Sequence, residues 1–139
     1  MRWMRLLLVA LLLSAVPQLA HSEDTPFERD IVPLIANRCL GCHSASDPHG
    51  ELVLSTRGGA LAGGESGDPA LVPGKPDDSY LLTKIRDGEM PPDGEGEPLT
   101  EAETALLEGW IKSGAPWPED RTLSPYEFTT DQRAGFDWW

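Results

Sequence analysis

One five-residue segment limits the folds open to this chain more than any other: Cys39-Leu40-Gly41-Cys42-His43. This C-x-x-C-H pattern is the attachment signature of a covalently bound c-type haem. Cysteines three positions apart lie on one turn of backbone, so both thiols can reach the two vinyl groups of one porphyrin. The imidazole of His43 then points at the iron as its proximal ligand. We therefore expect one covalent haem c, with Cys39 and Cys42 as its thioether residues.

The N-terminus has the features of a secretory signal peptide. Arg2 and Arg5 give it a basic start, and residues 6–16 form an apolar run. Small residues at the −3 and −1 positions mark a cleavage site after Ser22, so we assign residues 1–22 to the signal peptide and expect an exported protein, periplasmic or at the cell surface. A retained membrane anchor is the alternative, but the run is shorter than the ~20 apolar residues of a bilayer span. We expect no membrane span once the signal is removed.

The cysteine pair has two other interpretations. In an oxidising compartment the thiols would by default form a disulfide, and C-x-x-C thiols are redox-active in thioredoxin-like proteins, where the motif lies in a βαβ context that this sequence lacks. The other interpretation is a metal site without haem, and zinc requires four ligands. The cysteines and histidines left after signal removal are crowded into one short stretch: Cys39, Cys42, His43 and His49. Haem attachment is the preferred interpretation.

The charge balance is acidic. The chain has 11 Lys and Arg residues against 23 Asp and Glu residues, a formal net charge of −12. This charge disfavours nucleic acid and anionic membranes as partners. It favours redox partner proteins with a basic docking patch, because opposite charges steer the encounter. Keeping an exported protein soluble explains the acidic balance equally well.

A capping pattern predicts the first helix of the mature chain. Thr25 fits the N-cap, Pro26 the first helical position, and Glu28 would complete a capping box. Apolar residues at helical spacing predict its buried face: Phe27, Ile31, Leu34 and Ile35. Because Pro33 removes a backbone hydrogen bond, we expect a kink or two short helices that meet near Val32.

Polar and glycine-rich segments follow the haem segment. In the polar loop over residues 44–50, we expect a backbone carbonyl to accept the second ring N–H of His43 and fix the imidazole. Residues 51–75 contain too many glycines for a regular helix, so we expect an irregular loop that passes closely around the haem. Within it, Leu52 and Leu54 alternate like a short strand.

A second helix is expected over residues 80–85, with Asp77 or Ser79 as its cap and Gly88 as its terminator. Met90 follows in a proline-held loop and is the one methionine left after signal removal. Its thioether is soft enough for haem iron, so we expect Met90 to be the second axial ligand. A core residue that fills a gap is the alternative.

A second capping box predicts the last helix. Glu103 lies three residues after Thr100, and Gly114 can close the helix after about Ser113. We expect this helix to cross the first one and to cover one haem edge, with Trp110 in the core.

The domain organisation is a single haem domain over residues 23–118, followed by an irregular aromatic tail over residues 119–139. The end of the tail is rich in aromatic side chains: Phe136, Trp138 and Trp139. We interpret the tail as the start of a truncated following region or as a segment that packs on something else.

With these motifs placed, the sequence resembles the planctomycete-type cytochrome c domain over roughly residues 25–118. The residues that carry the resemblance include and flank the haem segment: Phe27, Ile31, Pro33, Cys39 to His43, Gly50, Leu52, Leu54, Gly63, Gly64, Gly67, Val72 to Gly74, Ser79, Met90 to Pro92, Leu99, Thr100 and Trp110 to Ala115. The resemblance implies an all-α, small cytochrome c-like fold, with roughly three to four short helices around one covalent haem and a long Gly-rich loop. It also implies His43 as proximal and Met90 as distal ligand, usually in the N-terminal domain of a larger exported protein.

We expect an electron-transfer protein rather than an enzyme, and assign no catalytic residue. The haem iron would cycle between Fe(III) and Fe(II) with His43 and Met90 as its axial ligands, so no substrate would bind at the metal. The alternatives are a haem enzyme or gas sensor with an open iron position, and a haem-containing interaction module of a larger protein. Candidates for contacts with the haem propionates are Arg57, Lys84 and Arg86.

Overall fold

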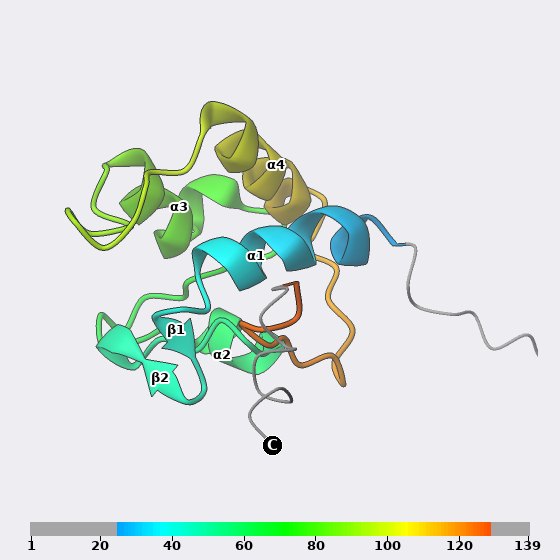
Figure 1. Ribbon diagram of the computed structural model, residues 1–139. Helices are drawn as coiled ribbons and strands as arrows, with labels where there is room; N and C mark the ends of the chain where they lie inside the picture. The colour runs from blue at the N-terminus through cyan, green and yellow to red at the C-terminus, as the bar shows by residue number, and fades with distance from the viewer. Residues whose placement is uncertain (1–24, 129–139) are drawn as a thin grey trace, which may run out of the picture.

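The computed structural model describes residues 25–128 (Figure 1). Within this range lie four α-helices and one antiparallel pair of two-residue strands, in this order: α1 (Val32–Arg38), β1 (His43–Ser44), β2 (Asp47–Pro48), α2 (Arg57–Ala62), α3 (Tyr80–Arg86) and α4 (Glu101–Lys112). The described part is therefore mostly helical, as the sequence predicts, with a small sheet that was not predicted. No helix between residues 25 and 128 is long and apolar enough to cross a membrane.

Pro33 divides the first helical segment, as predicted. The turn Phe27–Ile31 is π-helical, and the Val32 N–H donates to the carbonyl of Phe27, five residues earlier. α1 then begins at Val32 and holds Pro33 in its first turn. Because proline has no N–H, the backbone hydrogen bonds of the helical run are interrupted at this position. The two helical pieces meet at Val32.

The capping box at the start of this segment is only half formed. The Glu28 N–H donates to Thr25 Oγ1 at 3.2 Å. The Glu28 carboxylate does not return to Thr25, because it accepts two hydrogen bonds from the Arg121 guanidinium at 2.9 and 3.0 Å. A charge-assisted bidentate pair with a residue 93 positions away has replaced the local bond. It ties the start of the first helical segment to the chain that follows α4.

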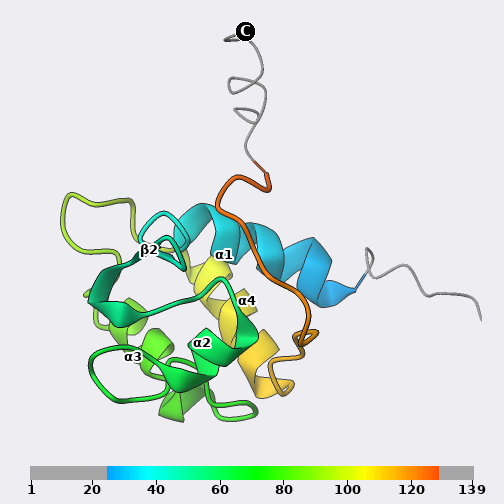
Figure 2. The ribbon, with the colours of Figure 1, turned by 90° about the horizontal axis from the view of Figure 1, so that it is seen from below.

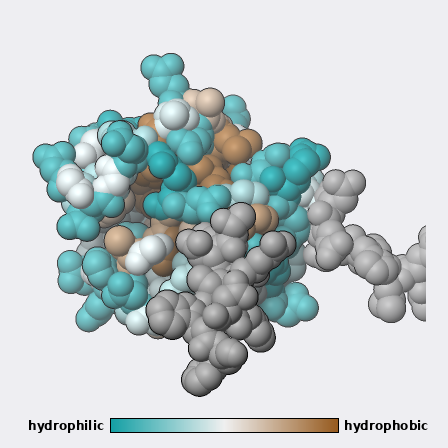
Figure 3. Space-filling view, viewed as in Figure 1, coloured by the Kyte–Doolittle hydropathy of each residue, from teal (hydrophilic) through white to brown (hydrophobic). Residues whose placement is uncertain are grey.

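α4 lies beside the first helical segment (Figures 1 and 2). The ring centroid of Phe27 is 5.8 Å from that of Trp110 and 5.0 Å from that of Trp117. The buried Trp110 indole N–H donates to the Pro116 carbonyl at 3.2 Å, so its polar atom is satisfied. Trp110 is a core residue, as predicted. Figure 3 shows that hydrophobic residues also reach the surface in the region of α4, where Leu106 is 40% exposed.

The ends of α4 agree with the prediction. Thr100 Oγ1 accepts from the Glu103 N–H at 3.1 Å, and the Glu103 carboxylate accepts from the Thr100 N–H at 2.7 Å. This N–H stabilises the ionised carboxylate and so lowers the pKa of Glu103. After Lys112 the chain turns away at Gly114, whose φ is 102°.

α3 begins after Ser79, but the Ser79 side chain does not cap it. The buried Ser79 hydroxyl accepts from the Val72 N–H and donates to the Lys75 carbonyl, both at 2.9 Å. It therefore ties the glycine-rich segment to the start of α3. Gly88, with φ of 72°, follows the end of α3, as predicted.

The prediction of an irregular loop over residues 51–75 is wrong where α2 forms. Thr56 caps α2, its Oγ1 accepting from the Gly59 N–H at 3.2 Å. A Cβ at Gly59 would lie 2.3 Å from the Val53 carbonyl oxygen, so only glycine fits this contact without a shift of the backbone. The glycine permits a closely packed helical turn rather than preventing one.

Residues 119–128 form no helix or strand, but they pack on the domain. Leu123 is only 3% exposed, and its N–H donates to the Ser55 carbonyl at 2.8 Å. The Trp117 indole N–H donates to the Arg121 carbonyl at 2.9 Å. The aromatic end of the tail and the signal peptide inferred from the sequence lie outside the described residues.

Candidate functional site

The haem segment begins where α1 ends. The Cys39 N–H donates to the Ile35 carbonyl at 2.9 Å and so continues the helical pattern by one residue. The N–H groups of Cys42 and His43 then both donate to the Cys39 carbonyl, at 3.2 and 3.0 Å. These bonds close a compact turn that holds the two thiols and the imidazole on one short piece of backbone. Both cysteines are free and partly exposed.

The surroundings of the Cys39 thiol disfavour its ionised form. Loss of hydration raises its pKa to about 12, although the nearby Arg38 charge acts in the opposite direction. The thiol is therefore neutral near pH 7, whereas the thiolate is the attacking form. A metal site without haem also finds no support, because no three His, Cys, Asp or Glu residues between 25 and 128 are grouped to hold an ion.

The imidazole of His43 is held in one tautomer. His43 is only 8% exposed, and its Nδ1 lies 3.0 Å from the His49 carbonyl oxygen. Because a carbonyl oxygen can only accept, Nδ1 carries the proton and Nε2 keeps its lone pair. Burial also lowers the pKa of His43, which favours the neutral ring that binds metals. The carbonyl predicted to fix the ring is that of His49.

The small sheet places His49 beside the ring. β1 and β2 pair antiparallel, with His43 opposite Pro48. The His49 N–H donates to the Cys42 carbonyl at 2.8 Å, and the Leu54 N–H donates to the His43 carbonyl at 2.7 Å. The backbone around His43 is thus fixed by the segments on either side of the turn. Leu54 is buried, but the short strand predicted for it does not form.

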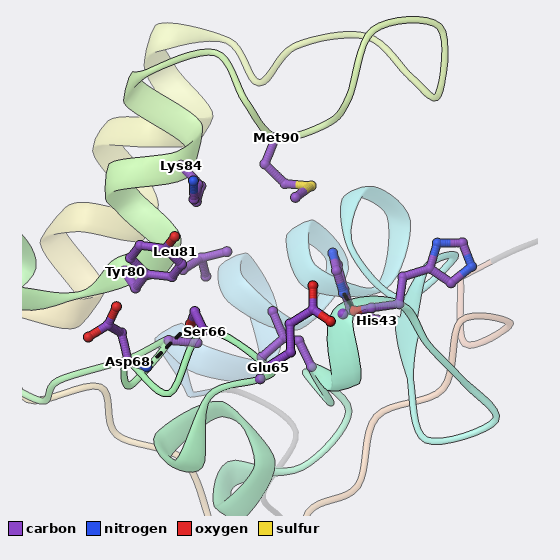
Figure 4. A pocket seen from close by; sticks show the side chains of 13 residues that line it. His43, Glu65, Ser66, Asp68, Tyr80, Leu81, Lys84 and Met90 are labelled. Carbon is purple, nitrogen blue, oxygen red and sulfur yellow. Dashed lines mark hydrogen bonds between the residues drawn. The ribbon is translucent and has the colours of Figure 1, made fainter.

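Two cavities share His43, Leu81 and Met90 among their lining residues, and Figure 4 shows the larger one. The larger has a volume of about 250 Å³ and the smaller about 60 Å³, and both are lined by His43, Leu81 and Met90. In Figure 4, Met90 extends from the loop after α3, and His43 lies across the opening from it. All four residues assigned to the haem from sequence line the smaller cavity: Cys39, Cys42, His43 and Met90.

The walls of these cavities are largely apolar. The aliphatic side chains that line them come from four different segments: Leu52 and Leu54, Ala70, Leu81 and Ile85 of α3, and Leu99. Gly64 lets two wall segments approach closely, because a Cβ there would lie 2.3 Å from the Gly50 carbonyl oxygen. Apolar walls with a few placed polar groups are typical of cofactor pockets. No residue of α4 lines either cavity, so the expected cover of a haem edge by α4 is not seen in their lining.

Met90 lies in a loop, as predicted. Its N–H donates to the Lys84 carbonyl at 3.1 Å, which anchors the loop to the end of α3. The peptide bond between Met90 and Pro91 is cis. The thioether thus enters the cavity from a segment that does not belong to the helical core.

Of the three basic candidates for contacts with the propionates, Lys84 lines the larger of these two cavities, and Arg57 and Arg86 line neither. Its Nζ pairs with Glu89 and lies 5.0 Å from the centroid of the Tyr80 ring. The hydrogen bond to Glu89 is the main reason why the pKa of Lys84 is raised. Arg57 and Arg86 instead form ion pairs away from the cavities.

Some lining residues were not assigned from the sequence. Tyr80 and Leu81 line the larger cavity together with Lys84, and helical spacing on α3 would have grouped them once Lys84 was placed there. Glu65 has no such local signal. Its position follows from a long-range bond, in which the Glu65 N–H donates to the Gly50 carbonyl at 2.8 Å.

The donor set fits a covalent haem c. Two free thiols lie beside an imidazole whose Nε2 lone pair is available, and a thioether lies across the same cavities. These are the groups that hold c-type haem and its iron in His/Met cytochromes. In this structure, Cys39 and Cys42 would form the thioethers, and His43 and Met90 would be the axial ligands.

Comparison with known proteins identifies the same segment. Residues 39–94 match the family model described as Planctomycete cytochrome C. The matched stretch begins at Cys39 and extends past Met90, so it contains all four haem residues inferred from the sequence. The match confirms the resemblance to the planctomycete-type cytochrome c domain. No curated protein and no solved structure matches the chain.

Proposed function

We propose that this chain, which carries a planctomycete-type cytochrome c domain, is an exported one-electron carrier with a single covalent haem c. Cys39 and Cys42 would hold the haem as thioethers, and His43 and Met90 would bind its iron. The bound haem supplies Fe(III)/Fe(II) chemistry at a potential that His/Met ligation raises relative to bis-His ligation.

One observation carries this proposal. His43 and Met90 line the same pair of cavities, and both thiols line the smaller one. With both His43 and Met90 as ligands, the iron would have no position open to a substrate. This arrangement suits electron transfer rather than catalysis at the metal.

The chain's own residues have defined tasks in this scheme. The His49 carbonyl holds the proton on Nδ1 of His43, which fixes the ring and increases the basicity of Nε2. The aliphatic walls exclude water and so favour the less charged, reduced state of the site. Lys84 is the cation at the larger cavity, where it would compensate propionate charge in exchange for its contact with Glu89.

The mouth of the larger cavity supports the expectation of a basic partner protein. Exposed Glu65 and Asp68 line it (Figure 4), and Asp47 lies 3.2 Å from the ring of His49, another lining residue. A partner with a basic patch would be steered to this rim, and its association rate should fall as salt increases. Nucleic acid would be repelled by the same charges.

Replacement of Met90 tests the proposal. The reduced, haem-loaded parent should be low-spin and bind carbon monoxide poorly, because both axial positions are filled. Met90→Ala should become high-spin in the oxidised state and bind carbon monoxide readily. Leu52→Ala is the matched control, because it enlarges the same cavity without removing a ligand atom, and it should resemble the parent in both measurements.

The outcomes separate the alternatives. A parent that binds carbon monoxide freely contradicts the carrier function and favours a gas sensor or haem enzyme. A Met90→Ala variant with the spectrum of the parent shows that another residue is the distal ligand. Equal changes in Met90→Ala and Leu52→Ala would show that cavity packing, not ligation, controls the iron.

A further inference from the structure

Arg38 joins three parts of the molecule next to the haem segment. It is the last residue of α1 and directly precedes Cys39. Its Nη2 donates to the backbone carbonyls of Glu97 and Pro98, at 3.0 and 2.9 Å. Its Nε lies 3.3 Å from the Glu103 carboxylate of α4. The side chain is 27% exposed, so these contacts are partly shielded from water.

The loop that Arg38 holds, residues 91–99, starts directly after Met90. Within the loop, the Glu95 N–H makes one local hydrogen bond. In the described part of the chain, the hydrogen bonds that join this loop to a distant residue both come from Arg38. Leu99, partly buried against the core, is the apolar anchor at the end of the loop.

Arg38 also lines the smaller cavity together with both cysteines and Met90. A guanidinium suits this position, because its planar fork can donate to two carbonyls and face a carboxylate at the same time. The same side chain therefore contacts the wall that bears the haem thiols and the loop that bears the methionine.

We propose that Arg38 is a positioning residue that clamps the 91–99 loop to the end of α1 and thereby keeps Met90 on the haem iron. This inference rests on the proposed function, since it takes Met90 to be the distal ligand. It adds a residue whose effect on the iron is indirect and passes through Met90. Loss of the clamp increases the fraction of molecules in which the thioether is away from the iron.

The primary test is Arg38→Gln in the haem-loaded protein. Loss of two charge-assisted hydrogen bonds should speed carbon monoxide binding by the reduced protein by roughly tenfold or more. Arg38→Lys keeps the charge but not the fork, so its rate should lie between those of Arg38→Gln and the parent. Arg86→Gln is the matched control, because Arg86 pairs with Asp77 and Glu108 and makes no contact with the loop. It should leave the rate unchanged.

A double variant tests whether the effect passes through Met90. Arg38→Gln should add no further acceleration to Met90→Ala, because the ligand that it positions is already absent. An equal acceleration in both backgrounds overturns the proposal, since it would show general loosening of the pocket. An Arg38→Gln variant that behaves like the parent, while Met90→Ala differs, overturns the positioning role alone. A Met90→Ala variant identical to the parent overturns the proposed function and this inference with it.

Proteolysis supplies a readout that does not depend on the iron. A glutamate-specific protease should cut after Glu95 on the order of tenfold faster in haem-loaded Arg38→Gln than in the parent or in Arg86→Gln. If Arg38→Gln does not load haem, Arg38→Lys carries the same comparison, with a smaller increase expected. Cleavage at the parental rate in a variant that binds carbon monoxide faster contradicts a clamp on the loop.

Discussion

The first helical segment has two ends, and the regions beside them are built in different ways. On the aromatic side, at its start, Phe27 packs against Trp110 and Trp117, so the chain fills this space with its own rings. On the cavity side, beyond its last residue, His43 and Met90 face each other across two cavities. The aromatic side is held mainly by ring contacts, together with the Glu28–Arg121 pair, whereas the cavity side is held by backbone hydrogen bonds and by the guanidinium of Arg38.

This difference separates stability from function. Burial of apolar rings is non-directional and contributes in proportion to the area removed from water, so the aromatic side can hold the domain together without a cofactor. The cavity side needs directional bonds, because its side chains must point at a cofactor instead of at one another. Substitutions on the two sides should therefore be distinguishable by separate measurements of unfolding and of haem ligation.

The largest effect on unfolding should come from the aromatic side. Phe27→Ala removes a buried ring from its contacts with two indoles and should lower the free energy of unfolding by about 3–5 kcal/mol. Phe128→Ala is the control, because Phe128 is 47% exposed, and it should change that energy by about 0.5 kcal/mol or less. Denaturant titration measures both, and the haem spectrum of folded Phe27→Ala should match the parent. A cost below about 1 kcal/mol would show that this side does not dominate stability.

Gly64→Ala should displace the backbone on the cavity side. Its Cβ would meet the Gly50 carbonyl oxygen at 2.3 Å, so the backbone beside His49 must move, at a cost of about 1–3 kcal/mol. We expect less stable protein with altered His43 ligation in its spectrum. Gly58→Ala is the matched control, because nothing lies within 4 Å of its Cβ and it lies in α2. It should be neutral or stabilising by up to about 1 kcal/mol. Equal thermal shifts in the two variants would contradict this account.

Thr100→Ala tests the start of α4, which packs beside the first helical segment and also contacts Arg38. Thr100 caps this helix and holds the Glu103 carboxylate that faces Arg38. The expected loss is about 1 kcal/mol in the free energy of unfolding. Thr122→Ala, at an exposed position, should change little. Equal free energies of unfolding for the two threonine variants would show that the Thr100 cap does not stabilise the domain.

The smallest predicted effect is on the pH dependence of the free energy of unfolding. The pKa of Glu103 is lower in the folded chain than its ordinary value of 4.5, chiefly because of the Thr100 N–H. The unfolded chain therefore binds a proton first as the pH falls. The contribution of Glu103 is complete above pH 4.5 and is lost as the pH falls through the lowered pKa. Glu103→Gln should flatten this part of the stability curve. If the free energy of unfolding of Glu103→Gln depends on pH in the same way as that of the parent, Glu103 is not the group responsible.

Local signals predicted the parts of the fold that depend on near neighbours. Thr100 and Glu103 are three residues apart and need only each other, so the start of α4 was predicted correctly. The same pattern at Thr25 and Glu28 formed only in part, because Arg121 competes for the carboxylate from the far end of the domain. A capping box can be recognised in sequence, but a distant competitor for its side chain cannot.

The candidate site divides in the same way. The haem segment and the role of a loop carbonyl near His43 follow from short spacings. The structure confirms the carbonyl, which is that of His49, and places Cys39, Cys42 and His43 on one cavity. Arg38 could not be assigned, because its partners lie 59 and 60 residues further along the chain. α2 was not predicted, because the many glycines of residues 51–75 were interpreted as preventing a helix. Gly59 is instead required within the helix, because its backbone lies against the Val53 carbonyl. Such requirements appear only when distant segments are packed together.

The central claim is that Cys39 and Cys42 hold one haem covalently, and an alkaline pyridine spectrum tests it most directly. The protein is exported in a host that matures c-type cytochromes, purified, extracted with acid and acetone to remove non-covalent haem, and reduced. We predict the absorption band of haem c at one haem per chain, and its complete loss in the double variant Cys39→Ser, Cys42→Ser. A colourless parent after extraction, or a double variant that keeps the band, would contradict the account.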